Sequence, residues 1–147
     1  MVINRIDIEE CKDIDGAYYK AFPGVKQYHN YCFYRAEHYP YTSNLFGVRY
    51  YGANGHKLRN LLVQGSAAHF LKQRIRALWE FQQQSGCKSR MQLQIHDELV
   101  WELKKGDPPL AKKFKEIMED WDDALVPIIA EGEVTTTTWA DKQELDL

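Results

Sequence analysis

The apolar positions in the first forty residues recur at helical spacing and predict two helices. The first begins near Asp7 and carries apolar side chains three or four positions apart, at Ile8, Cys11, Ile14 and Tyr18. Pro23-Gly24 interrupts the pattern, and a second helix is predicted from Val25 towards His38. An aromatic face on this helix is more typical of core packing than of ligand contact. It comprises Tyr28, Tyr31, Cys32 and Phe33.

A short hairpin and a long helix are predicted next. The hairpin pairs residues 41–45 with residues 48–51 and turns at Phe46-Gly47. The helix runs from about Gly55 to Gln84. Its apolar side, which we expect to face a core, is formed by Leu58, Leu62, Leu71, Ile75 and Leu78.

The last third of the chain begins with a second predicted hairpin, residues 91–103, in which two alternating apolar runs flank His96-Asp97-Glu98. A helix is predicted after Asp107-Pro108-Pro109 and runs towards Leu125, and a final strand covers residues 126–134. Helices combined with antiparallel hairpins predict an α+β fold. No linker, repeat or low-complexity stretch interrupts this order.

The composition is that of a soluble globular chain. The 147 residues are 44% hydrophobic and 27% charged, which is enough to bury a core. Cys11, Cys32 and Cys87 are odd in number and lack CxxC spacing, which argues against a disulfide scaffold or a zinc site and suits a reducing compartment. No apolar run has the length of a membrane span, and the N-terminus lacks the apolar segment of a signal peptide. We therefore expect a cytoplasmic location and no membrane partner.

The charge is distributed unevenly along the chain, although the net charge is only −2. Residues 49–76 contain six Lys or Arg and no Asp or Glu, whereas residues 97–147 contain fourteen acids and six Lys or Arg. A basic segment in an acidic chain indicates a surface that meets a polyanion. A basic helix neutralised by the acidic part of the same fold explains the pattern equally well, so both interpretations stay open.

The tip of the second hairpin is the first candidate site. Tight hairpin turns favour Asn-Gly or Asp-Gly, but here the turn is built from His96, Asp97 and Glu98. An imidazole and two carboxylates are thereby placed at one protruding point. Magnesium prefers oxygen ligands and is often held by one or two carboxylates together with substrate phosphates. A solvated polar turn explains the same residues, so the local pattern leaves both interpretations open.

The long helix carries the second candidate site. His56, Asn60 and Gln64 stand at positions i, i+4 and i+8 and therefore share one helix face. Residues 65–68, Gly-Ser-Ala-Ala, follow directly and allow another backbone to come close. Amide donors beside basic residues suit the minor groove of a duplex, where every base pair presents similarly placed acceptors. Ordinary helix packing, with the amides simply exposed, is the alternative.

Two segments resemble the distinctive motifs of one enzyme family. Residues 60–68, Asn-Leu-Leu-Val-Gln-Gly-Ser-Ala-Ala, resemble a helix motif written N-x-x-x-Q-G-T-A-A, and Lys72 falls where that helix carries a lysine. Residues 94–98, Gln-Ile-His-Asp-Glu, resemble motif C, usually Q-V-H-D-E. Both motifs belong to the family A DNA polymerases, the DNA polymerase I type found in bacteria and many phages.

Further segments resemble the same family in the right order. Residues 18–25 resemble the Y-F-x-x-F/Y-P-x-V segment of the fingers, and residues 45–49 resemble the T-L-F/D-G-R-R hairpin. Val126-Pro127 and Trp139 fit the family's closing strand and terminal tryptophan. The resemblance covers about residues 8–141 in unbroken order.

The resemblance implies a fold that is part of a larger polymerase. Residues 1–40 would be distal fingers-type helices, and residues 41–147 would be the C-terminal palm segment. The palm segment would be an antiparallel sheet with the motif C hairpin packed on long helices. The implied activity is that of a DNA-directed DNA polymerase, which adds nucleotides from dNTP to primer-template DNA with two Mg2+ ions.

The resemblance also implies roles for individual residues. Asp97 would be one of two palm aspartates that hold the metal ions, Glu98 a nearby second acid, and His96 would lie against the primer terminus. Gln64 and Asn60 would donate to minor-groove acceptors of newly formed base pairs, and Arg49 would meet backbone phosphate or sugar. The full set of implied DNA-binding residues is Gln64, Asn60, His56, Arg49 and Lys72.

The chain departs from the family pattern at two positions and lacks two motifs. The family often has arginine where His56 stands, and His69 replaces the acid that usually ends Q-G-T-A-A-D. Motif A, a D-Y-S-x-I/Q-E-x-R stretch with the second aspartate, does not occur, nor does motif B, the R-x-x-x-K-x-x-x-x-x-x-Y-G helix that grips the triphosphate. We therefore expect a chain that is inactive alone. It would need a larger polymerase chain with motifs A and B, whose motif A aspartate would share the two Mg2+ ions.

Two origins of the chain stay open, and two other functions fit the sequence less completely. The chain could be one half of a naturally split phage polymerase, working in the host cytoplasm, or an excised fragment. A catalytically silent DNA-binding or structural subunit is the alternative function, but binding alone would not require Asp97 to face DNA phosphate. A metal-dependent nuclease using His96, Asp97 and Glu98 explains the hairpin but not the order of the other motifs.

Overall fold

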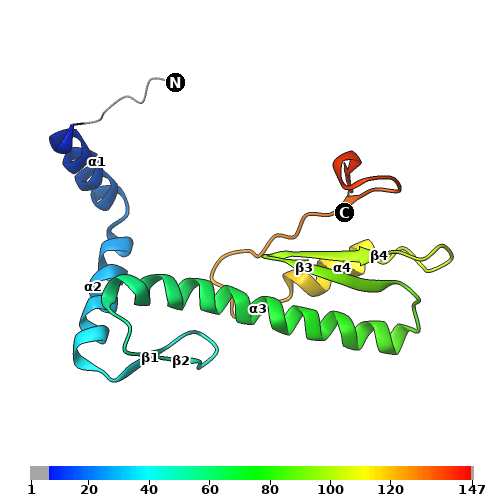
Figure 1. Cartoon of the computed structure of the whole chain (residues 1–147), viewed down its shortest axis with the longest axis horizontal. Helices are drawn as coiled ribbons and strands as arrows, with labels where there is room; N and C mark the ends of the chain where they lie inside the picture. Colours follow the sequence, from blue (N-terminus) through cyan, green and yellow to red (C-terminus); the bar gives the residue numbers. More distant parts are fainter. Residues whose placement is uncertain (1–6, 147) are drawn as a thin grey trace. The chain divides into compact units, whose positions relative to one another are not determined.

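A computed structural model describes residues 7–146. Contacts divide the chain into two units, Met1–Ala67 and Ala68–Leu147, and the long helix α3 (Gly55–Ser85) contributes residues to both. Figure 1 shows the order of the elements along the chain. None of the helices in the described part of the chain has the length and apolar character needed to span a bilayer. The fingers and palm assignment to residues 1–40 and 41–147 stays a prediction.

The two helices predicted at the start of the chain are confirmed as α1 (Ile8–Ala21) and α2 (Pro23–His38). The Asp7 carboxylate caps α1 by accepting a hydrogen bond from the Ile8 N–H at 2.6 Å. Phe22 separates the helices, because Pro23 has no N–H to extend α1 but fits the first position of α2. No side chain of α1 is buried.

The core of the first unit forms where α2 meets the beginning of α3. It consists of Cys32, Leu58 and Leu62, with Tyr28 packed against them. The Tyr28 hydroxyl donates to the carbonyl of Arg59 at 2.8 Å, and burial raises the pKa of Tyr28 to about 12. The predicted core face of α2 is therefore confirmed at Tyr28 and Cys32. Tyr31 on the same helix remains 49% exposed.

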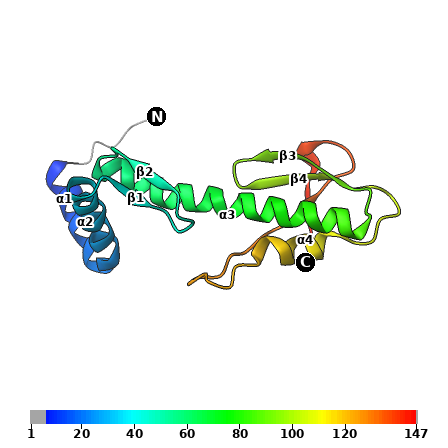
Figure 2. The same ribbon diagram turned by 90° about the horizontal axis from the view of Figure 1, so that it is seen from below.

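The first predicted hairpin is confirmed as β1 (Tyr41–Ser43) and β2 (Arg49–Tyr51), paired antiparallel. Asn44 fixes its turn, because its side-chain oxygen accepts hydrogen bonds at 3.0 Å from the N–H groups of Phe46 and Val48. Gly47 adopts φ +78°, a conformation that glycine takes without strain. Figure 2 shows this hairpin alongside the first half of α3.

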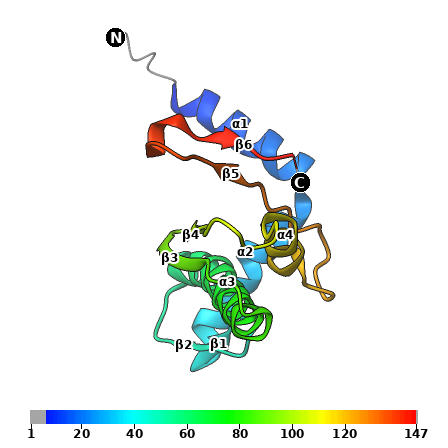
Figure 3. The ribbon, with the colours of Figure 1, turned by 90° about the vertical axis from the view of Figure 1, so that its right-hand side faces the viewer.

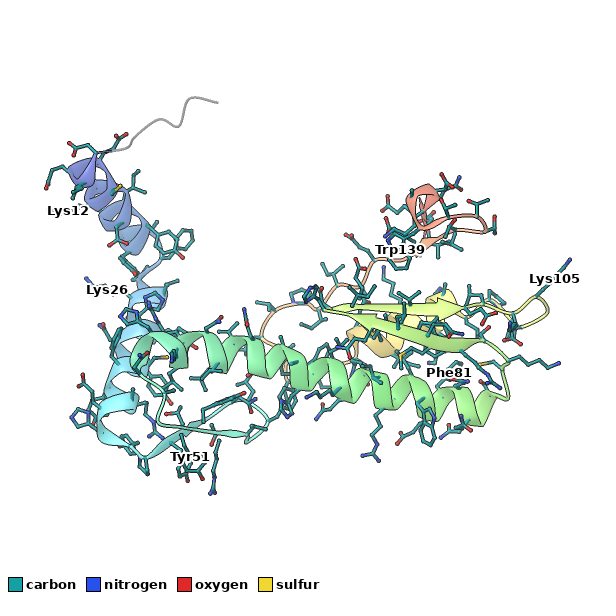
Figure 4. The ribbon with its side chains drawn as sticks, in the orientation of Figure 1. Lys12, Lys26, Tyr51, Phe81, Lys105 and Trp139 are labelled. Atoms are coloured by element: carbon teal, nitrogen blue, oxygen red, sulfur yellow. The ribbon has the colours of Figure 1, made fainter. Side chains whose placement is uncertain are left out.

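The second unit packs a hairpin and a short helix against the later part of α3. The hairpin consists of β3 (Arg90–Ile95) and β4 (Glu98–Glu102), and the helix is α4 (Ala111–Glu119). Phe114 of α4 lies 4.3 Å from Trp101 and 6.3 Å from Phe81 between ring centroids. Figure 3 views α3 nearly end-on with α4 and the hairpin beside it, and Figure 4 labels Phe81 on α3. Leu71 and Leu78 are buried here, which confirms the predicted apolar side of α3.

The helix predicted to run towards Leu125 was wrong in its C-terminal part, because α4 ends at Glu119. The Arg74 guanidinium bonds the backbone carbonyls of Ile117 and Asp120 and the Asp120 carboxylate, and thereby takes the acceptors that end the helix. A turn follows, in which the Ala124 N–H donates to the Trp121 carbonyl. Leu125 is fully exposed.

The final strand predicted over residues 126–134 was also too long. Only β5 (Glu133–Val134) is a strand, and it pairs with β6 (Gln143–Glu144) after the short 3-10 helix η1 (Trp139–Asp141). Pro127 cannot donate a ladder hydrogen bond, which disfavours a strand at that end of the segment. The α+β class and antiparallel pairing are confirmed. Between residues 7 and 146 the strands form three separate two-stranded sheets.

Candidate functional site

The acidic tip of the β3–β4 hairpin is a turn of two residues. Ile95 pairs with Glu98 across the strands, so His96 and Asp97 alone form the loop and Glu98 is the first residue of β4. The Gln94 side-chain amide donates to the His96 carbonyl at 3.1 Å and braces the turn. The predicted hairpin is confirmed, with its three candidate residues consecutive at one end.

His96 adopts φ +53°, the only positive φ of a non-glycine residue in the described part of the chain. Two-residue hairpin loops need a positive φ at their first position, where glycine or asparagine is usual. Histidine in this conformation costs roughly 1 kcal/mol relative to glycine. The turn therefore keeps histidine at a position where glycine would fit with less strain.

The side chains of His96, Asp97 and Glu98 are all exposed. Lys142 provides a positive charge near Glu98. Its hydrogen bond to Glu133 raises the pKa of Lys142, and the negative charge of Glu98 adds to that increase. Within residues 7–146, no cluster of three or more His, Cys, Asp or Glu side chains could hold a metal ion. Two adjacent exposed carboxylates nevertheless fit the partial protein ligand set that magnesium accepts when substrate phosphates supply further oxygens.

The base of the hairpin is held by a hydrogen-bonded cluster that the sequence pattern does not indicate. One Asp107 carboxylate oxygen accepts from the Lys88 N–H at 2.8 Å and from both the N–H and hydroxyl of Ser89 at 2.7 Å. The buried Ser89 hydroxyl also accepts from the Lys104 N–H at 3.0 Å. The Ser89 hydroxyl and the backbone donors lower the pKa of Asp107. The Asp-Pro-Pro sequence that begins at Asp107 indicates a turn, but it does not indicate Ser89 as the partner of Asp107.

The second candidate site lies on α3 in the first unit. His56, Asn60 and Gln64 are exposed at successive turns of one helix, as predicted. The side-chain amides of Asn60 and Gln64 bond to no other residue between 7 and 146 and stay available to a ligand. The Asn54 side chain caps the start of this helix by accepting from the Lys57 N–H at 2.9 Å.

The small residues after Gln64 seat the β1–β2 hairpin on α3. A methyl group on Gly65 would lie 1.9 Å from the Tyr50 hydroxyl, so only glycine allows this approach. The Ser66 hydroxyl donates to the Leu62 carbonyl at 2.6 Å and accepts from the Leu45 N–H at 3.3 Å. The predicted close approach is therefore confirmed, with a hairpin backbone of the same chain as its partner.

The other two predicted DNA-binding residues are also exposed. Arg49 lies on β2 with its guanidinium 4.5 Å from the centre of the Tyr41 ring, next to Tyr51, which Figure 4 labels. Lys72 lies on the part of α3 that belongs to the second unit, as does the hairpin tip. The remaining DNA-binding candidates belong to the first unit.

The comparison with solved structures defines the class of fold. The chain is similar to the POL domain of Pol1 from M. smegmatis, solved in complex with DNA primer-template and dNTP. The TM-score is 0.68 and the sequence identity 28%, over 78% of this chain and 22% of that chain. The fold is thus that of part of a polymerase domain. The family model for DNA polymerase family A matches residues 3–141, and the chain belongs to that family.

Curated relatives agree with this assignment. DNA polymerase I of Streptococcus pneumoniae (strain TIGR4) is 31% identical in an alignment 147 positions long that covers 91% of this chain and 17% of the relative. DNA polymerase I of Helicobacter pylori is 34% identical in an alignment 131 positions long that covers 79% of this chain and 14% of the relative. The chain therefore spans less than a fifth of the length of these relatives.

Proposed function

We propose that this chain is the C-terminal part of a DNA-directed DNA polymerase and works in the cytoplasm with a larger chain that carries motifs A and B. It would supply one metal-binding carboxylate and contacts to the primer-template duplex. The observation that carries the proposal is the two-residue turn that exposes Asp97 beside Glu98, in a chain of DNA polymerase family A.

The hairpin tip would serve nucleotidyl transfer. Asp97, with Glu98 beside it, would hold Mg2+ together with the partner's motif A aspartate and the oxygens of a bound dNTP. When bound, two such ions activate the attacking hydroxyl and neutralise charge on the triphosphate. His96 would contact the primer terminus from the first position of the turn. Its strained backbone supports this role, because glycine would form the same turn more easily.

The exposed face of α3 would bind the duplex. Asn60 and Gln64 lie at successive turns, and their side-chain amides bond to no other residue in the described part of the chain. The acceptors of the minor groove are similar in every base pair. Hydrogen bonds to these acceptors bind a duplex of any base sequence, and they weaken when a mispair displaces the acceptor. Arg49 and Lys72 would contact backbone phosphate, in a segment without acids.

Exposed apolar surface supports a partner chain. Leu93 and Ile95 of β3 are 55% and 40% exposed, and Ile8 and Ile14 of α1 are more than half exposed. Two-stranded sheets are only marginally stable by themselves, and their strand edges can pair with strands of another chain. A larger chain that adds strands and covers these side chains would complete the polymerase fold.

Primer extension tests the proposal. The chain would be purified alone and co-expressed with a chain from the same genome that carries motifs A and B. We expect extension of a primer by the complex, no extension by the chain alone, and loss of extension with Asp97→Ala. The matched control Asp123→Ala changes an exposed carboxylate in the loop after α4 and should retain activity.

The outcomes separate the functions. Extension by the chain alone would refute the need for a partner, and full activity of the Asp97→Ala complex would refute the metal-binding role. Duplex binding without extension by any complex would favour the catalytically silent DNA-binding subunit. Cleavage of DNA that depends on Asp97 would favour the nuclease.

A further inference from the structure

Arg59 on α3 bonds two histidine rings at once. Its Nη1 lies 2.9 Å from Nδ1 of His29 on α2, and its Nη2 lies 2.6 Å from Nδ1 of His56 one turn earlier on α3. The Arg59 backbone is fixed as well, because its carbonyl accepts the hydrogen bond from Tyr28. The guanidinium also lies over the Phe33 ring at 5.6 Å. Arg59 is therefore an anchored donor, and the residue is half-buried.

The contact with Arg59 fixes the proton of His56. A guanidinium can only donate hydrogen bonds, so the ring nitrogen that faces it must accept. Nδ1 of His56 is then without a proton, and the neutral ring must carry its proton on Nε2. Phe33 meets the same ring edge-on at 4.7 Å between centroids and limits its rotation. His56 is thus an oriented N–H donor rather than a freely rotating imidazole.

The donor points away from the two groups that fix the ring. Nε2 lies across the ring from Nδ1, and the His56 side chain is exposed on the helix face that carries Asn60 and Gln64. All three side chains on this face then offer N–H groups that no residue between 7 and 146 accepts. Purine N3 and pyrimidine O2 in a minor groove are acceptors without donors of their own at the same position.

We propose that Arg59 is a positioning residue for duplex binding: it holds His56 in the Nε2–H form, so that His56 adds a third minor-groove donor to Asn60 and Gln64. This inference rests on the proposed function of the α3 face. The histidines take only two of the five N–H groups of Arg59, so the double variant is needed to separate the role of Arg59 in holding His56 from a direct contact of Arg59 with the DNA.

The tautomer can be measured without DNA. The full chain, labelled with 15N at histidine, would be examined by long-range 1H–15N correlation spectra at a pH where the rings are neutral. We expect His56 to show a protonated Nε2 and an unprotonated Nδ1, and to show a mixture of tautomers in Arg59→Met. His29→Gln is the matched control, because it removes the other partner of Arg59 and should leave the His56 signal unchanged. A protonated Nδ1 on His56 in the wild-type chain would overturn the inference.

Duplex binding tests the consequence. The probe is a primer-template duplex, compared with the same duplex in which 3-deazaadenine replaces adenine and removes the N3 acceptor. Loss of one hydrogen bond corresponds to a roughly three- to tenfold weaker Kd. We expect His56→Phe and Arg59→Met each to weaken binding of the normal duplex by about that factor. The double variant should be no weaker than either single variant, and all three should show a smaller penalty for the 3-deazaadenine probe.

The result distinguishes failure of the inference from failure of the proposed function. If Gln64→Ala weakens duplex binding but Arg59→Met and His56→Phe do not, the α3 face binds DNA and the role of Arg59 is wrong. If none of the three variants changes binding, the proposed duplex contact itself is wrong. Additive losses in the double variant would show that Arg59 acts independently of His56 and would also overturn the inference.

Discussion

Replacing Gly65 with alanine should destabilise the first unit, although alanine is the better helix former. The new methyl group would lie 1.9 Å from the Tyr50 hydroxyl and 3.0 Å from its ring carbon, where an ordinary contact needs at least 3.4 Å. Tyr50 cannot easily retreat, because its hydroxyl accepts from the Asn44 amide and its ring packs against the core of α2 and α3. Overpacking of this kind costs about 1–3 kcal/mol. Removal of a helical glycine returns about 1 kcal/mol, so the expected net loss is about 1 kcal/mol.

Gly16 provides the matched control within the same unit. It is a helical glycine of α1 with open space around its missing methyl group, so Gly16→Ala should stabilise the chain by about 0.5–1 kcal/mol. Free energies of unfolding would be measured by urea denaturation followed by circular dichroism. In a Tyr50→Phe background, Gly65→Ala should cost less, because the closest atom is gone. Equal stabilisation by Gly65→Ala and Gly16→Ala would refute the contact between α3 and the β1–β2 hairpin.

Three further predictions address single side chains. His96→Gly relieves a positive φ and should leave the free energy of unfolding within about 1 kcal/mol of wild type, yet it should reduce primer extension by the complex. Lost stability with normal primer extension would contradict this prediction. The pKa of Asp107 is lowered, so its contribution to stability is present above the ordinary carboxyl pKa and is lost as the pH falls through the lowered value. The urea midpoint of Asp107→Asn should therefore fall less than that of wild type as the pH is lowered. The pKa of Tyr28 is raised to about 12 from 10.0, so stability should fall as the pH rises between these values, and Tyr28→Phe should lessen that fall in midpoints measured over the same range.

The sequence predicted best those elements that carry their signal locally. α3 was predicted within one residue of its C-terminus, because its apolar residues keep helical spacing over many turns. The β3–β4 hairpin was predicted from alternating apolar residues, and its acidic tip followed from the same pattern. The helical spacing of Asn60 and Gln64 sufficed to place them on one face.

The errors and omissions involve partners far apart in the chain. Arg74 ends α4 by bonding Asp120 across 46 positions, and nothing near Asp120 indicates that contact. Asp107 holds Ser89 across 18 positions, and Arg59 reaches His29 across 30 positions. Such pairs depend on how elements pack, which residue spacing within one element does not encode. The roles of His96, Asp97 and Glu98 stay predictions that the proposed experiments test.

The exposed helix α1 has a consequence for how assembly would proceed. A helix of 14 residues that buries no side chain has few tertiary contacts, of which the hydrogen bond between the Tyr19 hydroxyl and Nδ1 of His29 is one. Isolated helices of that length are only marginally stable in water. If the partner covers Ile8 and Ile14, ordering of α1 and association become one thermodynamic event. Calorimetry of assembly would then show a more negative heat capacity change for the full chain than for a chain lacking α1. Amide hydrogen exchange in α1 would slow on assembly far more than exchange in α3, so exchange in α1 would measure the fraction of chain bound to its partner.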